Sequence, residues 1–205
     1  EPAMSNEKTP DSDRLIAWVD VETTGLNEQA GSILEVGIIL TDNALNEVAE
    51  WSRVVAFRDC VDPEIEAMHG PDGSGLLARP MFRPWPSFMF SFVEGSSNAP
   101  PDRGDVADEA IKWLCSHCGD VAPLWGGRNP HFDRRWLRHH MRTLHDTMHH
   151  RNVDETTARI LLESWAGITI PKDPAAGTKH RVLPDLRETL RVMREVRKAF
   201  GRLRS

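Results

Sequence analysis

The chain has 205 residues, the length of one domain or of two small ones, and it can bury a hydrophobic core without cross-links. Its formal charge of -6 argues against broad electrostatic binding to nucleic acid, but does not exclude a nucleic-acid enzyme, because metal ions and a local basic surface offset negative charge. No apolar run approaches the ~20 residues of a membrane span, no signal peptide is recognisable and three cysteines form no disulfide framework, so we expect a cytoplasmic protein with no membrane partner.

The first part of the chain predicts three consecutive strands after a polar tail. We expect residues 1–13 to be a disordered tail or a cloning remnant. Residues 14–21 predict the first strand, and residues 32–41 are apolar enough for a second strand that is buried on both faces. Residues 50–57 alternate like a third strand, which completes a meander, and residues 63–69 predict a short helix.

A proline-rich and aromatic excursion covers residues from about 70 to 104. Its six prolines exclude long regular elements. Its aromatic side chains make it too apolar for a simple linker. Two interpretations stay open: a loop that packs its aromatics on the body of the domain, and a lid for a partner or substrate.

The second half of the chain alternates helices and strands. The predicted elements are a helix at 105–118, a strand at 121–125, a helix at 130–144, a short strand at 152–154, a helix at 155–166, a loop at 171–179 and a helix at 184–200. There is no internal repeat and no second core. The order of elements indicates an α/β fold, in which helices flank a mixed five-stranded sheet.

Asp20 and Glu22 close the first predicted strand and point to the same face, with Cα atoms roughly 6–7 Å apart. Two carboxylates aimed at one spot repel each other unless a cation lies between them, and a hard divalent ion fits such an all-oxygen site. The alternative is a strand end whose acidic residues face solvent. Further acidic groups from elsewhere in the chain would favour the metal site.

Two later segments supply such groups. Asp133 follows the fourth predicted strand and opens a helix. Asp185 lies at the start of the last helix, and His180 precedes it by five positions. Histidine has an unperturbed pKa near 6.5, which suits a general base at neutral pH.

These motifs, in this order, resemble those of the DEDDh family of 3′→5′ exonucleases. That family has an Asp-x-Glu on the first strand, an Asp in a Phe-Asp segment and a final His-x4-Asp. The resemblance implies a ribonuclease H-like exonuclease fold, with residues 14–205 as a single exonuclease domain.

Within that family the chain is most similar to the oligoribonucleases. Residues 41–50 resemble the segment after their second strand, residues 150–157 resemble their Tyr-Arg-Asn-Leu-Asp-x-Ser-Thr stretch, and residues 179–197 resemble their last helix. Two features depart from the pattern. Thr23-Thr24 replaces the usual Met-Thr, and residues 129–133 are closer to the proofreading subunit of bacterial DNA polymerase III.

The resemblance implies a metal-dependent exoribonuclease that degrades short oligoribonucleotides to nucleoside 5′-monophosphates by two-metal-ion hydrolysis. It implies two divalent ions, Mg2+ or Mn2+, and a general base, His180. The implied metal ligands, which are also catalytic, are four carboxylates: Asp20, Glu22, Asp133 and Asp185.

The resemblance also implies contacts with the substrate, a short single-stranded RNA or possibly DNA. Thr23, Gly25 and Leu26 would approach the terminal nucleotide, with Leu26 as a wedge between the last two bases. His150 stands where the oligoribonucleases have the aromatic residue that one subunit lends to the other. We therefore expect a homodimer.

Two other functions stay open. A 3′→5′ DNA exonuclease of the proofreading type is favoured by Thr23-Thr24 and by residues 129–133. A catalytically silent nucleic-acid or protein binding module would use the aromatic excursion as its docking surface. The complete set of four carboxylates and one histidine argues against a silent module.

Overall fold

The computed structural model describes residues 9–57, 69, 101–171 and 180–203. Five strands form one sheet in the order β3-β2-β1-β4-β5. Their bounds are β1 Ile16–Thr23, β2 Ile33–Thr41, β3 Glu47–Val54, β4 Leu124–Gly127 and β5 Asn152–Asp154. The pairs β1–β2 and β2–β3 are antiparallel, and the pairs β1–β4 and β4–β5 are parallel. The predicted mixed five-stranded sheet is confirmed.

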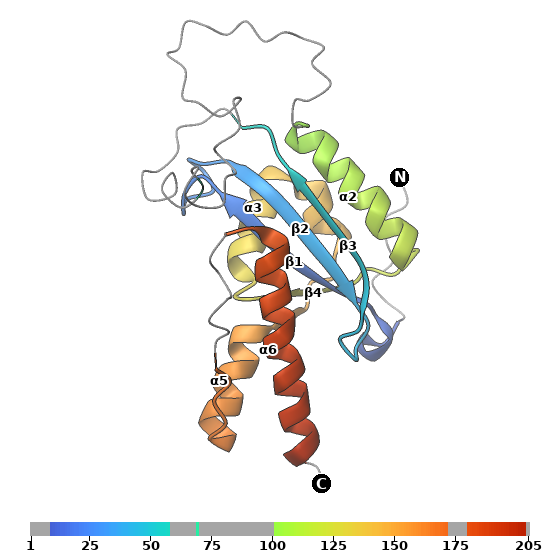
Figure 1. Ribbon diagram of the computed structural model, residues 1–205. Coiled ribbons are helices and arrows are strands. Elements are labelled where there is room, and N and C mark those ends of the chain that lie inside the picture. The colour runs from blue at the N-terminus through green and yellow to red at the C-terminus, as the bar shows by residue number, and fades with distance from the viewer. Residues whose placement is uncertain (1–8, 58–68, 70–100, 172–179, 204–205) are drawn as a thin grey trace, which may run out of the picture.

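Helices cover both faces of this sheet (Figure 1). Their bounds are α2 Arg103–Cys118, α3 His131–His140, α4 Arg142–Thr147, α5 Glu155–Ala166 and α6 Val182–Leu203. Helices α2, α3 and α4 pack on one face, while α6 packs on the other against β1 and β2. Beyond the sheet, α6 packs against α5 through a small apolar cluster (Figure 1). In the part of the chain that the structure describes, every helix is too short or too polar to cross a membrane.

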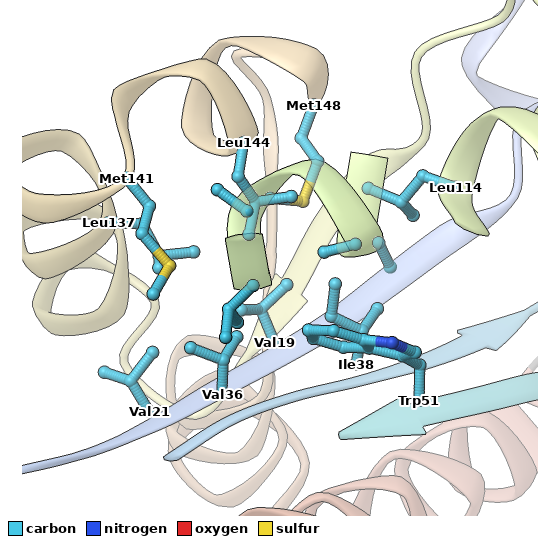
Figure 2. Close-up of a cluster of buried hydrophobic side chains, with 14 of the residues drawn as sticks. Val19, Val21, Val36, Ile38, Trp51, Leu114, Leu137, Met141, Leu144 and Met148 are labelled. Atoms are coloured by element: carbon cyan, nitrogen blue, oxygen red, sulfur yellow. The ribbon is translucent and has the colours of Figure 1, made fainter. Parts of the chain in front are cut away.

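The alternation of side chains along β1 builds two separate cores. Ala17, Val19 and Val21 face α2, α3 and α4, and Figure 2 shows Val19 and Val21 in that cluster with Ile38, Leu114 and Leu144. Ile16 and Trp18 point the other way and pack against Leu186 and Leu190 of α6. Since strand side chains alternate with a period of two, Asp20 and Glu22 continue the row that faces α6.

Gly37 lets the first turn of α6 approach the sheet closely. It is the β2 residue that pairs with Asp20. A Cβ atom at this position would lie 2.5 Å from Cγ2 of Val182, the first residue of α6. The missing side chain therefore creates the space in which the start of α6 lies beside Asp20.

The structure corrects three expectations from the sequence. Part of the expected tail at 1–13 is ordered, because Asp11–Asp13 is a 3-10 turn and Asp11 forms an ion pair with Arg151, while residues 1–8 lie outside the described residues. The third strand begins at Glu47 rather than Glu50, because Glu47 already pairs with Thr41 across a short turn.

The third correction concerns the helix expected at 130–144. It is broken at Met141, whose backbone is not helical and whose side chain is buried. The bend lets α3 and α4 follow the same core. The expected short helix at 63–69, apart from His69, most of the excursion at 70–104, and most of the loop at 171–179 lie outside the described residues.

Candidate metal centre

Three carboxylates from two distant parts of the chain meet at one end of the sheet. Asp20 and Glu22 come from β1, and Asp185 comes from the first turn of α6. Oxygen atoms from the three side chains lie within 4.8 Å of one another. The structure therefore brings together the first two predicted acidic residues, Asp20 and Glu22, and the last one, Asp185.

Burial raises the pKa values of all three carboxyl groups, and neighbouring carboxylates raise them further. Burial raises the pKa of Asp20 well above its ordinary value, and the charges of Glu22 and Asp185 raise it further. Burial, followed by the charges of Asp185 and Glu35, raises the pKa of Glu22 to about 8. The pKa of Asp185 is also raised by burial, although the charge of His180 lowers it in part. A cation between the three groups would favour their ionised forms, and an all-oxygen donor set fits a hard divalent ion.

Asp133 lies beside this group and is fixed by the backbone of β1. Its Oδ1 accepts a hydrogen bond of 3.1 Å from the N–H of Val21. Strand β4 pairs with β1 only as far as Trp18, so this N–H is free to bond the carboxylate instead. Burial raises the pKa of Asp133, and the charge of Asp20 raises it further. Asp133 is not one of the three clustered carboxylates, but it is electrostatically linked to Asp20.

His180 enters the site from the backbone just before α6. Its φ of +40° is unusual for a residue with a side chain, and it turns the chain into the helix that carries Asp185. The charge of His180 lowers the pKa of Asp185, and its ring lies edge-on to that of His69, which contacts Glu22.

His69 is a site residue that the sequence did not single out. Its Nε2 lies 3.3 Å from Oε2 of Glu22, and its ring lies edge-on to that of His180, with centroids 6.4 Å apart. Burial lowers the pKa of His69, so the neutral imidazole is favoured beside a carboxyl group whose own pKa is raised. A lone histidine in a predicted short helix carries no signal of this contact.

Glu35 and Arg181 were also missed. The Arg181 guanidinium donates two hydrogen bonds to Glu35, of 2.8 and 2.6 Å, and the N–H of Val182 donates a third to the same carboxylate. Glu35 is 2% exposed and pairs with Glu22 across β1 and β2. A charged residue inside an apolar strand was the available signal, since a buried carboxylate requires a partner.

The expected substrate contacts form two groups. The hydroxyl of Thr23 donates a 2.7 Å hydrogen bond to the carbonyl of Gly25, which shapes the turn after β1. Leu26 follows this turn and is 77% exposed. His150 is exposed on the link before β5, and among the described residues it contacts Arg134 and His149 rather than the carboxylates.

Comparison with known proteins finds similarity along almost the whole chain. An oligoribonuclease from Chromobacterium violaceum is 29% identical over 93% of this chain and 97% of the relative. An oligoribonuclease from Corynebacterium efficiens is 30% identical over 92% of this chain and 79% of the relative, and one from Arabidopsis thaliana is 26% identical over the same shares. No family model matches the chain.

Solved structures show a similar fold in exonuclease I. The enzyme from Methylocaldum szegediense has a TM-score of 0.65 at 16% identity, and the E. coli enzyme in complex with a dT13 oligonucleotide has a TM-score of 0.64 at 14% identity. The chain spans 40% and 42% of these two structures, and 90% or more of it is covered. At this identity the likeness shows the fold, a ribonuclease H-like nuclease fold.

Proposed function

Since this chain belongs to the oligoribonuclease family and is a 3′→5′ exoribonuclease, we propose that it degrades short single-stranded RNA to nucleoside 5′-monophosphates at the site described above. The observation that carries the proposal is the meeting of Asp20, Glu22 and Asp185 from two distant elements in a chain of this family.

The carboxylate oxygens support divalent metal dependence, and the proposed number of ions is two, Mg2+ or Mn2+. Asp20, Glu22 and Asp185 would hold one ion, and Asp133 together with Asp20 would hold the second. Such ions stabilise the negative charge that develops on the attacking and leaving oxygens during phosphodiester hydrolysis. The protein contributes by fixing the ligands: β1 sets the spacing of one pair, and α6 supplies the third from the opposite side.

His180 is the proposed general base, which takes a proton from the attacking water. Its place beside Asp185 at the start of α6 supports this role.

Thr23, Gly25 and Leu26 are the proposed contacts to the terminal nucleotide. The hydrogen-bonded turn of Thr23 and Gly25 directly follows Glu22, so it borders the reacting phosphate. The exposed side chain of Leu26 is available to insert between the last two bases. Stacked apolar and base surfaces would exclude water there.

A homodimer is the proposed assembly, with His150 reaching the substrate held by the other copy. Trp165 and Ile160 of α5 are 77% and 50% exposed, which gives the second copy an apolar surface to cover. Light scattering of the Trp165→Ser variant tests this, with Val48→Ser on β3 as an exposed control. A wild-type monomer that fully degrades diribonucleotides would refute the dimer.

A cytoplasmic setting is also proposed, because Cys115 and Cys118 are free thiols, as is usual in a reducing compartment.

The experiment that tests the function compares 5′-labelled RNA and DNA of two to five nucleotides, and long strands of each, with Mg2+ and with Mn2+. The expected result is rapid loss of short RNA from the 3′ end, with Asp20→Ala inactive. Asp146→Asn, an exposed ion-pair residue of α4, is the matched control and should be fully active. Equal or better turnover of long DNA would favour the proofreading type of exonuclease, and no hydrolysis of any strand would favour a silent binding module.

A further inference from the structure

Arg128 is a positive charge at the edge of the acidic site. It directly follows β4, and the parallel register of β1 and β4 aligns Ile16 with Leu124 and Trp18 with Gly126. If this register is continued by two residues beyond Trp18 and Gly126, Arg128 lies opposite Asp20. The charge of Arg128 lowers the pKa values of both Asp20 and Asp185, which agrees with this placement.

A buried carboxylate holds one edge of this guanidinium. The Nε of Arg128 donates a 3.2 Å hydrogen bond to Glu155, whose side chain is 1% exposed, while the side chain of Arg128 is 48% exposed. The next residue is fixed as well, because the N–H of Asn129 bonds Asp154. Among the described residues, Nη1 and Nη2 of Arg128 make no hydrogen bond or ion pair, so a paired donor edge is presented at the site.

Glu155 is shared by two arginines. Its second oxygen accepts a 3.2 Å bond from Nε of Arg159, one helical turn along α5. Two guanidinium groups therefore share one buried carboxylate, and Asp154 supplies the next negative charge at this rim. Of these two arginines, Arg128 is the one whose charge lowers the pKa values of Asp20 and Asp185, so its guanidinium is the one that acts on the site.

A guanidinium with two free donors, fixed beside a cluster that binds cations, has the geometry for a phosphate group. We propose that Arg128 binds a phosphate of the RNA strand next to the metal centre and thereby positions the strand for cleavage. This inference rests on the proposed function. The ligand is either the phosphate between two nucleotides or a phosphate at the 5′ end of a very short strand.

Kinetics on two diribonucleotides, pApA and ApA, distinguish these two sources. Arg128→Gln is expected to raise KM about 10- to 100-fold. The effect covers both substrates if the arginine binds the internucleotide phosphate, and pApA alone if it binds the terminal phosphate. Arg159→Gln is the matched control, because it loses the same partner on Glu155, and its KM is expected to stay within about threefold of the wild type.

The Mn2+ affinity of the Arg128→Gln variant, measured without RNA, distinguishes phosphate binding by Arg128 from a structural role of this residue. Removing a positive charge beside the carboxylates should leave Mn2+ affinity, measured by calorimetry, unchanged or increased. A variant with a distorted site would lose Mn2+ affinity. If Arg128→Gln is poorly folded, Arg128→Lys, which keeps the charge but not the paired donors, should give an intermediate KM for the affected substrate.

The proposal is overturned if Arg128→Gln and Arg159→Gln have the same KM on both substrates, or if Mn2+ affinity falls by as much as KM rises. Either result in an enzyme that hydrolyses RNA would leave the proposed function intact. A wild-type protein with no hydrolysis would remove the proposed function instead.

Discussion

Glu35 and Arg181 form an ion pair that joins the first part of β2 to the residue just before α6, with hydrogen bonds of 2.8 and 2.6 Å. Glu35 pairs with Glu22 across the sheet, and Arg181 directly follows His180. The pair therefore sets the distance between a proposed metal ligand and the proposed base, although neither of its members is assigned to the chemistry.

Breaking this pair should reduce catalysis as well as stability. We expect Arg181→Gln to lower kcat on a diribonucleotide about 10- to 100-fold, because His180 loses its fixed position. The free energy of unfolding should fall by up to about 3–5 kcal/mol, because Glu35 stays buried without its partner. Urea denaturation and steady-state kinetics measure the two effects.

Arg191→Gln is the control for this prediction, since Arg191 pairs with Glu188 further along the same helix. It should lose some stability and keep its kcat. An Arg181→Gln enzyme that is fully folded and has the wild-type kcat would show that the ion pair serves stability alone.

Gly37→Ala should displace the start of α6. The added Cβ would lie 2.5 Å from Cγ2 of Val182, so the helix must shift or the strand must bend, at a cost of about 1–3 kcal/mol. Asp185 would move with the helix, and we expect weaker Mn2+ binding by calorimetry. Gly201→Ala in the same helix meets no neighbour within 4 Å and should be neutral or stabilising. Unchanged Mn2+ affinity in Gly37→Ala would contradict this role of the glycine.

The metal-free protein should become less stable as the pH rises. The pKa of Glu22 is raised to about 8 in the folded state, so this state binds more protons than the unfolded chain between its ordinary pKa and that value. The contribution of Glu22 is therefore full below about pH 4.5 and is lost as the pH rises towards 8. Urea denaturation in EDTA should show this decline, which Glu22→Gln should flatten. Asp108→Asn, on the exposed side of α2, should decline like the wild type.

A divalent ion should reverse that decline. A divalent ion displaces the protons that the raised pKa values favour on these carboxyl groups, and the bound ion stabilises only the folded state. We expect Mn2+ to raise Tm in the wild type and to have little effect in Asp20→Asn, as measured by thermal denaturation against EDTA. Calorimetry in two buffers of different ionisation enthalpy should detect proton release when Mn2+ binds. Equal Tm shifts in the two proteins would place the ion elsewhere.

Local patterns were enough to predict most of the fold. The apolar run of β2 and the prolines and glycines around the helices predicted the element order, and α5 was predicted at its observed bounds. The break at Met141 was missed, because its cause is the shape of the core beneath α3 and α4 and not a local helix breaker.

The acidic residues of the candidate site were also found from the sequence, since each carries a motif at the end of an element. The supporting residues were not. Glu35, Arg181, His69 and Arg128 act through partners that are distant in the chain or through electrostatic proximity, and only the tertiary structure shows such pairs. The roles of Thr23, Gly25, Leu26 and His150 stay predictions.

Strand β1 places Ala17, Val19 and Val21 on one face and, one position out of phase with them, Asp20 and Glu22 on the other, in line with Ile16 and Trp18. The register of a strand cannot change for one residue alone, because a shift by one residue turns every side chain to the opposite face. Loss of one residue before Asp20 would direct its carboxylate into the cluster around Val19 and direct a valine towards Asp185. Evolution can therefore exchange single side chains in this strand, but an insertion or deletion would remove folding and catalysis in the same event.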